Sequence, residues 1–156
     1  MANTRAIKTY VEPYVRLWLE SQFPGHSFNE QAVPLLRKSD GTYAEHRFDA
    51  VSEDATIVAT IKSSGWWTSG RKRPAGKIGE VYQALYMLSI AQAAEKNLVL
   101  TDREFYDRFA RVSEGKVASE VRILLCPLPQ DIENRVRAVR AAASGEMNHA
   151  QAGPQS

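Results

Sequence analysis

The sequence has one cysteine, almost no net charge and no long apolar run, and each absence excludes a class of protein. With Cys126 as the only cysteine, neither a disulfide framework nor a zinc site built from several cysteines can form. No run approaches twenty apolar residues and no charged-then-apolar leader opens the chain, so we expect a cytoplasmic protein without membrane spans. The formal net charge of +2 is too small to indicate nucleic-acid binding by itself.

Length and composition indicate a folded α/β domain. The chain has 156 residues, of which 44% are hydrophobic, enough for one core and too apolar for wholesale disorder. Apolar periodicity stops at Ser144, where Gly, Pro, Gln and Asn become frequent. We therefore predict one domain over residues 1–143 and a disordered C-terminal tail over 144–156.

Hydrophobic spacing predicts alternating helices and strands. The expected strands are His26–Leu36, Tyr43–Val51, Thr56–Lys62, Asn97–Leu100 and Val121–Cys126. The expected helices are one through Val11–Leu19, one over Gly76–Lys96, one opening at Thr101 and one opening at Asp131. The first three strands are close enough in sequence for an antiparallel meander, whereas the later ones follow helices and are expected to add in parallel. This order, α-β-β-β-α-β followed by further elements, predicts a mixed central sheet flanked by helices.

The start of the first helix has two interpretations. Thr9 and Glu12 have the spacing of a capping box, which would place Pro13 harmlessly in the first turn. If the helix instead begins near Thr4, Pro13 lies inside it and should distort it.

The second and third strands bring polar side chains toward one another. If the Ser52–Ala55 turn closes a short hairpin, Asp49 lies opposite Val58, and Glu45 lies opposite Lys62. Cross-strand neighbours in such a hairpin are roughly 5 Å apart. The register therefore predicts a small polar patch at the end of the third strand.

Strand alternation decides which side chains share that patch. Asp49, Thr60 and Lys62 fall on one face together with Glu45, whereas His46 falls on the opposite face and is expected to be structural. A polar patch beside an apolar core must be satisfied either by mutual salt bridges or by a divalent cation with a phosphate.

The segments RFDAV and ATIVATIK, followed by a helix within this element order, resemble the PD-(D/E)XK, or restriction-endonuclease-like, nuclease superfamily. The resemblance covers roughly Val11 to Leu128, although its motif is short and degenerate. It implies a restriction-endonuclease-like α-β-β-β-α-β core, an Mg²⁺-dependent (or Mn²⁺-dependent) reaction and hydrolysis of DNA phosphodiester bonds.

The resemblance also implies roles for three residues. Asp49 matches the metal-binding aspartate of the second strand, with Phe48 where a proline would stand. Lys62 matches the lysine that orients the attacking water, and the carbonyl of Ile61 matches a backbone metal ligand.

The sequence departs from the family pattern at Thr60, where a carboxylate normally lies two residues before the lysine. Losing one carboxylate should weaken Mg²⁺ binding, so another acid is needed. Glu80 on the following helix is favoured, because some restriction enzymes have Ser/Thr-x-Lys on the strand and a glutamate on the helix. Glu45 and Glu12 are the alternatives. Without a replacement, the chain is a catalytically inactive relative that binds nucleic acid or a protein partner.

The loop after Lys62 concentrates basic charge. From Lys62 to Glu80, both included, there are five basic residues and one acid, a local charge of +4. We expect this loop to contact DNA, with cations on phosphates and one tryptophan on a base while the other joins the core. The alternative is a loop anchored by both tryptophans with a solvated basic run. The predicted contact residues are Trp66, Trp67, Arg71, Lys72, Arg73 and Lys77.

Two smaller expectations complete the interpretation. Cys126 precedes a proline on a buried strand and is expected to be a packed apolar residue without a histidine to activate it. A sequence-specific restriction enzyme of this length would act as a homodimer.

Overall fold

The structure is a computed structural model that describes residues 5–67 and 74–139. The chain divides into two compact units. One unit is Val15–Pro127, and the other combines the residues up to Tyr14 with those from Leu128 onward. The predicted tail at 144–156 lies outside the described residues.

The Val15–Pro127 unit is built on a five-stranded sheet with the order β1-β2-β3-β4-β5. β1, β2 and β3 pair antiparallel, whereas β3–β4 and β4–β5 pair parallel. The fold is therefore α/β with a mixed central sheet flanked by helices, which confirms the predicted class. The strands are β1 (Phe28–Arg37), β2 (Tyr43–Ser52), β3 (Ile57–Lys62), β4 (Glu95–Leu100) and β5 (Val121–Leu125).

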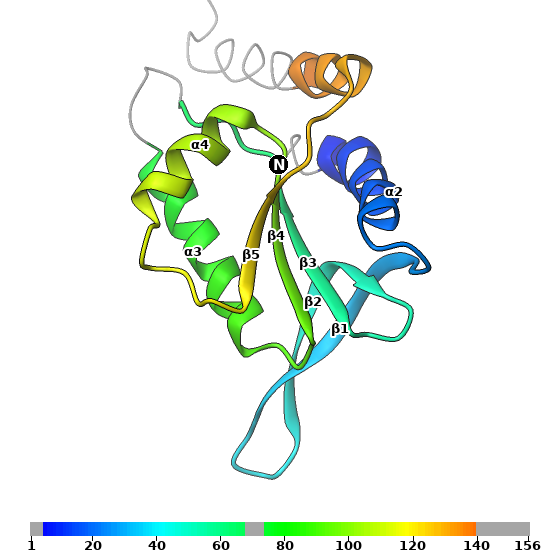
Figure 1. Cartoon of the computed structure of the whole chain (residues 1–156), viewed down its shortest axis with the longest axis vertical. Helices are drawn as coiled ribbons and strands as arrows, with labels where there is room; N and C mark the ends of the chain where they lie inside the picture. The colour runs from blue at the N-terminus through cyan, green and yellow to red at the C-terminus, as the bar shows by residue number, and fades with distance from the viewer. Residues whose placement is uncertain (1–4, 68–73, 140–156) are drawn as a thin grey trace, which may run out of the picture. The chain divides into compact units, whose positions relative to one another are not determined.

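Two helices make the parallel connections. α3 (Ala75–Ile90) links β3 to β4, and α4 (Arg103–Val112) links β4 to β5. Because both connections advance the sheet in the same direction, the right-handed rule places both helices on one face. Figure 1 shows α3 and α4 together on one side of the sheet and α2 (Glu12–Gln22) on the other.

The core between the sheet and these two helices is apolar and aromatic. Phe105 stacks on Phe109, with ring centroids 5.9 Å apart, and Trp66 meets Phe105 edge-on at 5.4 Å. From the strands, Phe48 and Leu98 are essentially inaccessible. This core fixes α3 and α4 against the sheet, so the polar side chains that α3 presents to the strands are held on a rigid support.

Two predicted helix ends differ from the structure. α3 was predicted to reach Lys96 but ends at Ile90, because the Gln92 main-chain N–H and side-chain amide donate to carbonyls of β1. The helix after β4 was predicted to be capped by Thr101. The cap is Asp102, which accepts from the N–H of Phe105, while the N–H of Thr101 donates to Lys62 on β3.

The N-terminal helix follows the earlier of its two predicted starts. Residues 5–6 are already helical, and η1 (Ile7–Val11) is a π-turn that leads directly into α2. The N–H of Glu12 donates to the carbonyl of Ile7, five residues back. A widened turn immediately before Pro13 is a local distortion of the kind expected where proline removes a helical donor and crowds the preceding turn.

Among the described residues, no helix combines the length and apolarity needed to cross a membrane.

Candidate functional site

The pairing of β2 with β3 is shifted by two residues from the predicted register. Val51 lies opposite Val58, where the predicted hairpin placed Thr56. The turn is wider than expected because β3 begins only at Ile57, whose N–H donates to the hydroxyl of Ser52. A shift of two preserves strand alternation, so Asp49 keeps its face and now lies level with Thr60.

β2 contains a β-bulge that the sequence did not reveal. On β1, Asn29 pairs with Val51 and Gln31 pairs with Phe48, so Asp49 and Ala50 together lie opposite one residue. Phe48 and Val51 consequently both enter the same core.

The bulge also corrects the prediction for His46, which was expected on the face opposite Asp49. The extra residue reverses the alternation between the two positions, and His46 lines the same pocket as Asp49. Its ring meets Phe48 edge-on, with centroids 4.7 Å apart.

Asp49 ends the pairing between β2 and β3. The β2–β3 pairs end at Ala50 with Ala59. The N–H of Ile61, which also points toward β2, donates to Oδ2 of Asp49 at 2.8 Å. Arg16 of α2 donates from Nε to the main-chain carbonyl of Asp49 at 2.9 Å. Because the N–H and C=O of one strand residue face the same neighbour, the Ile61 carbonyl is also directed toward β2.

A pocket of about 210 Å³ lies where the two strands part. Since a water molecule takes about 30 Å³ of liquid, this space accommodates several waters or a small hydrated group. β2, β3 and α3 all contribute to the walls. The lining residues are His46, Arg47, Asp49, Thr60, Lys62, Glu80, Gln83, Ala84 and Met87.

The charged side chains of this pocket do not neutralise one another by direct pairing. In the described part of the chain, neither the Lys62 nor the Glu80 side chain has a hydrogen bond or an ion pair, and the Asp49 carboxylate contacts only a main-chain N–H. Of the two ways we expected the patch to be satisfied, the mutual salt bridge is not formed.

The structure brings Glu80 to Asp49 and Lys62, whereas Glu45 lies outside this pocket. Glu45 is exposed on β2 opposite Pro34 of β1 and is not among the lining residues. Glu12 is buried at the start of α2, has interactions of its own and belongs to the other compact unit.

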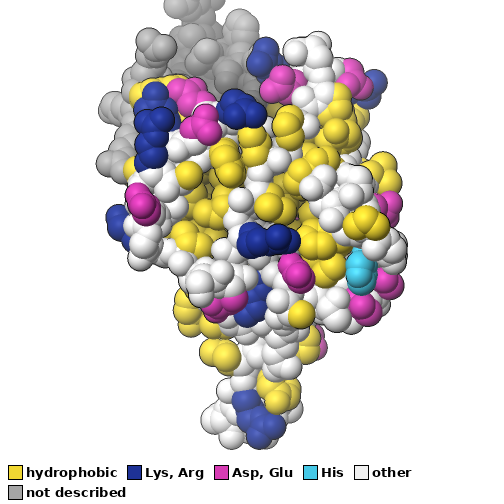
Figure 2. Space-filling view, in the orientation of Figure 1, with side chains coloured by type: hydrophobic (Ala, Val, Ile, Leu, Met, Phe, Trp, Pro, Cys, Tyr) yellow, Lys and Arg dark blue, Asp and Glu magenta, His cyan; other side chains and the backbone are white. Residues whose placement is uncertain are grey.

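One tryptophan of the loop after β3 lies in the core, as predicted, and the other is exposed; its contact with DNA stays a prediction. Trp66 is 5% exposed, whereas Trp67 is 41% exposed. Lys77, one turn before Glu80, donates from Nζ to the carbonyl of Gly65 at 3.3 Å and so ties α3 to this loop. The predicted contacts Arg71, Lys72 and Arg73 lie outside the described residues. Figure 2 shows basic and acidic side chains next to one another over the neighbouring α4.

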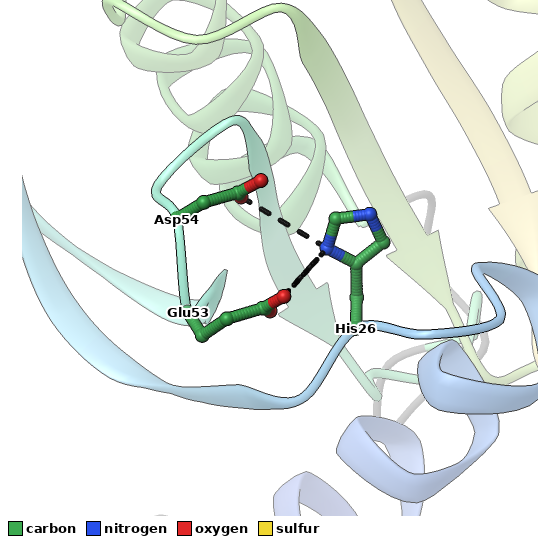
Figure 3. A group of neighbouring side chains, drawn as sticks. All are labelled: His26, Glu53 and Asp54. Atoms are coloured by element: carbon green, nitrogen blue, oxygen red, sulfur yellow. Dashed lines mark hydrogen bonds and ion pairs between the residues drawn. The ribbon is translucent and has the colours of Figure 1, made fainter.

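A second polar cluster, of His26, Glu53 and Asp54, lies at the β2–β3 turn (Figure 3). His26 Nδ1 is 3.1 Å from Glu53 Oε1, and the Ser27 N–H donates to the same carboxylate. Sequence reasoning missed this group because its spacing matches no metal motif.

The carboxylates of this turn cluster are already used by the turn itself. The hydroxyl of Thr56, followed by that of Ser52 and the Thr56 N–H, lowers the pKa of Asp54 to about 2. The Ser27 N–H is the main cause that lowers the pKa of Glu53. These contacts stabilise the ionised carboxylates and explain the wide turn that sets the strand register.

Cys126 is fully buried, as predicted, and its burial raises the pKa of the thiol to about 12. Such a thiol stays protonated at neutral pH, so it is not a nucleophile.

Comparison of the chain with protein-family models, with curated proteins and with solved structures finds no match. The chemistry of the pocket is therefore argued from the residues that line it.

Proposed function

We propose that this protein is a metal-dependent DNA endonuclease of the PD-(D/E)XK type. The observation that carries the proposal is that Asp49, Lys62 and Glu80 line one pocket without pairing with each other. Unpaired charges of both signs in one pocket are suited to a ligand that itself carries both signs, such as a phosphate with a divalent cation.

The oxygen atoms around the pocket fit Mg²⁺ or Mn²⁺. Asp49 uses one carboxylate oxygen for the Ile61 N–H and keeps the other, the Ile61 carbonyl faces the same strand, and Glu80 adds a second carboxylate. Hard oxygen ligands of this kind favour these ions over softer metals. A bound ion would supply Lewis-acid polarisation of a phosphoryl oxygen.

Lys62 is the residue that positions the attacking water in this proposal. A charged lysine offers three donors and no acceptor, so it holds a water by donating to its oxygen and does not itself remove a proton. Its side chain has no competing partner in the described chain, which leaves all three donors for water and phosphate. The Gln83 amide, on the same pocket wall, can donate to a second phosphate oxygen.

We place this nuclease in the cytoplasm. To cut both strands of a DNA site, it would act as a homodimer. One pocket can address one phosphodiester at a time, and a two-fold dimer presents two pockets to a palindromic duplex. The mass in solution with and without such a duplex tests the dimer.

The first test is cleavage of plasmid and linear duplex DNA in Mg²⁺ or Mn²⁺. Asp49→Ala, Lys62→Ala and Glu80→Gln should each lower the rate by about a hundredfold or more, the usual range for a group that acts on the reacting atoms. Glu45→Gln is the matched control, because Glu45 is an exposed acid on β2 outside the pocket. Cleavage that survives both Asp49→Ala and Lys62→Ala rejects the mechanism.

Thr60 favours a second function, that of a catalytically inactive relative that binds nucleic acid or a protein partner. Its hydroxyl side chain occupies the pocket wall level with Asp49, where the family has a carboxylate. Thr60→Asp distinguishes the two functions. If the protein is an active enzyme that uses Glu80 as its second carboxylate, Thr60→Asp should change a metal-dependent DNA cleavage rate that the wild-type chain already has. In the inactive relative it should create metal binding, measured by calorimetry, where the wild-type chain has none.

A further inference from the structure

A groove between the segment after β3 and α4 has features that the proposed active site does not use. It has a volume of about 400 Å³, and we call it the Trp67 groove. Its walls are two indole rings and one face of α4. The lining residues are Trp66, Trp67, Arg108, Arg111 and Val112.

Trp67 is held in a fixed orientation although 41% of it is exposed. Its indole N–H donates to Oε1 of Glu104 at 2.8 Å, and the guanidinium of Arg108 lies 4.8 Å from the ring centroid. Nε of Arg108 donates to the same Glu104 oxygen at 3.2 Å. An exposed aromatic ring that is already ordered loses little conformational entropy when a planar ligand stacks on it.

The groove also has a rigid wall and an available cation. Trp66 is buried and meets Phe105 of α4 edge-on, so its position is set by the core. Arg111 is exposed at the groove and has no ion pair within the described residues. Since Glu104 already balances Arg108, the unbalanced charge lining the groove is positive.

We propose that the Trp67 groove binds an unpaired nucleotide, with its base against Trp67 and a neighbouring phosphate on Arg111. An aromatic face beside a cation is the combination by which proteins hold single-stranded nucleic acid. A base inside a duplex has both faces covered by its neighbours, so only an unpaired or extruded base can use this ring. The ligand class rests on the proposed function, which supplies the reason to expect nucleic acid.

The distance to the active-site pocket is compatible with one continuous strand. Trp67 follows Lys62 by five residues, so their Cα atoms are at most about 18 Å apart. This limit corresponds to about five base steps at about 3.4 Å per step. The substrate class that this spacing favours is DNA with an unpaired segment a few nucleotides from the cut.

The test measures binding without cleavage. The wild-type chain in EDTA is titrated into a fluorescently labelled oligo-dT, and separately into a fully paired duplex of equal length, with anisotropy as the readout. Trp67→Ala should weaken oligo-dT binding by roughly tenfold or more, the effect of removing one stacking residue. Binding of the duplex should change by less than twofold.

A matched control is available on the β1–β2 hairpin. Tyr43 is 43% exposed, and Arg37 lies 5.4 Å from its ring centroid, so it has the same kind of cation–aromatic pair outside the groove. Tyr43→Ala should leave both affinities unchanged. Trp67→Phe is a more conservative substitution that keeps an aromatic face, so it should retain most of the wild-type affinity for oligo-dT. Arg111→Gln removes one phosphate contact, so the slope of log K against log salt concentration for oligo-dT should become less steep by about 0.7.

The outcomes separate this inference from the proposed function. The groove proposal is overturned if Trp67→Ala and Tyr43→Ala lower the affinity for oligo-dT equally, or if Trp67→Ala lowers the affinities for oligo-dT and duplex equally. It is also overturned if Trp67→Ala does not lower the affinity at all. If Trp67→Ala does not fold, Trp67→Phe decides the point. If oligo-dT binding depends on Trp67 but the protein never cleaves DNA, the groove proposal stands and the nuclease proposal is rejected. If metal-dependent cleavage of duplex DNA is unaffected by Trp67→Ala, and oligo-dT binding is too, the nuclease proposal stands and the groove proposal is rejected.

Discussion

The β2–β3 pair carries two polar clusters, one at its turn and one where the strands part, and they differ in what satisfies them. At the turn, Asp54 receives hydrogen bonds from Ser52 and Thr56, and Glu53 receives them from Ser27 and His26. In the pocket, the carboxylate of Glu80 and the ammonium of Lys62 have no partner among the described residues.

Of these two similar clusters, the one whose charged groups are not already used by the fold is the candidate site. The turn cluster has His and acid ligand atoms within 4.8 Å of one another, which is a possible metal geometry on distance alone. Its oxygens, however, already hold the turn together, so a metal would compete with contacts that set the strand register. In the pocket, Asp49 can keep its contact with the Ile61 N–H and still offer its second carboxylate oxygen, and Glu80 has no partner among the described residues to give up.

Stabilisation by a bound metal ion should distinguish the pocket from the turn cluster most strongly. At about a hundred times its dissociation constant, Mg²⁺ should stabilise the folded chain by about 2.7 kcal/mol and raise Tm by several degrees. Asp49→Ala should remove this protection in differential scanning fluorimetry, whereas Asp54→Asn should leave it intact. If the stabilisation by metal depends on Asp54 and not on Asp49, the metal binds at the turn cluster and the pocket is not the metal site.

A smaller effect concerns stability without metal. Ser52 is fully buried, and its hydroxyl accepts from the buried N–H of Ile57. Ser52→Ala leaves that donor unsatisfied and should lower the free energy of unfolding by about 1–3 kcal/mol. Glu80→Gln, at an exposed position without partners among the described residues, should change the free energy of unfolding by less than about 0.5 kcal/mol. Chemical denaturation measures both, and similar losses for the two variants would contradict the distinction.

The smallest expected effect is the response to acid. The folded-state pKa of Asp54 is lowered from 3.8 to about 2, so its contribution to stability is complete above about pH 4 and is lost as pH falls toward 2. The pKa values of Glu53 and Asp40 are also lowered, which places their contributions in the same acid range. Asp54→Asn should therefore flatten the dependence of Tm on pH between about 4 and 2. An unchanged dependence would show that the turn contacts do not form in solution.

Strand alternation predicted more of the site than residue spacing did. Asp49, Thr60 and Lys62 share a pocket because a β2–β3 register error of two residues leaves these three side chains on their predicted face. The approach of Glu80 follows from the right-handed connection that brings α3 over β3. The α/β class was predictable for the same reason, since it depends on element order and not on exact boundaries.

The sequence did not reveal features that depend on contacts between distant residues. His46 was assigned to the wrong face because a bulge leaves no signal in the alternation of a half-exposed strand. The length of α3 was overestimated because Gln92 continues the helical pattern while its amide binds β1. Asp102 and Thr101 are both good helix caps by residue type, and the β3–β4 pairing decides between them.

The bulge in β2 makes chain length at this point as important as residue identity. Deleting one residue between Phe48 and Val51 would restore simple alternation and exchange the two faces of the preceding part of the strand. Arg47 would then turn toward the apolar core, and Phe48 toward solvent. Point substitutions along β2 change one side chain each, but a single deletion here would move the core and pocket residues of half the strand at once.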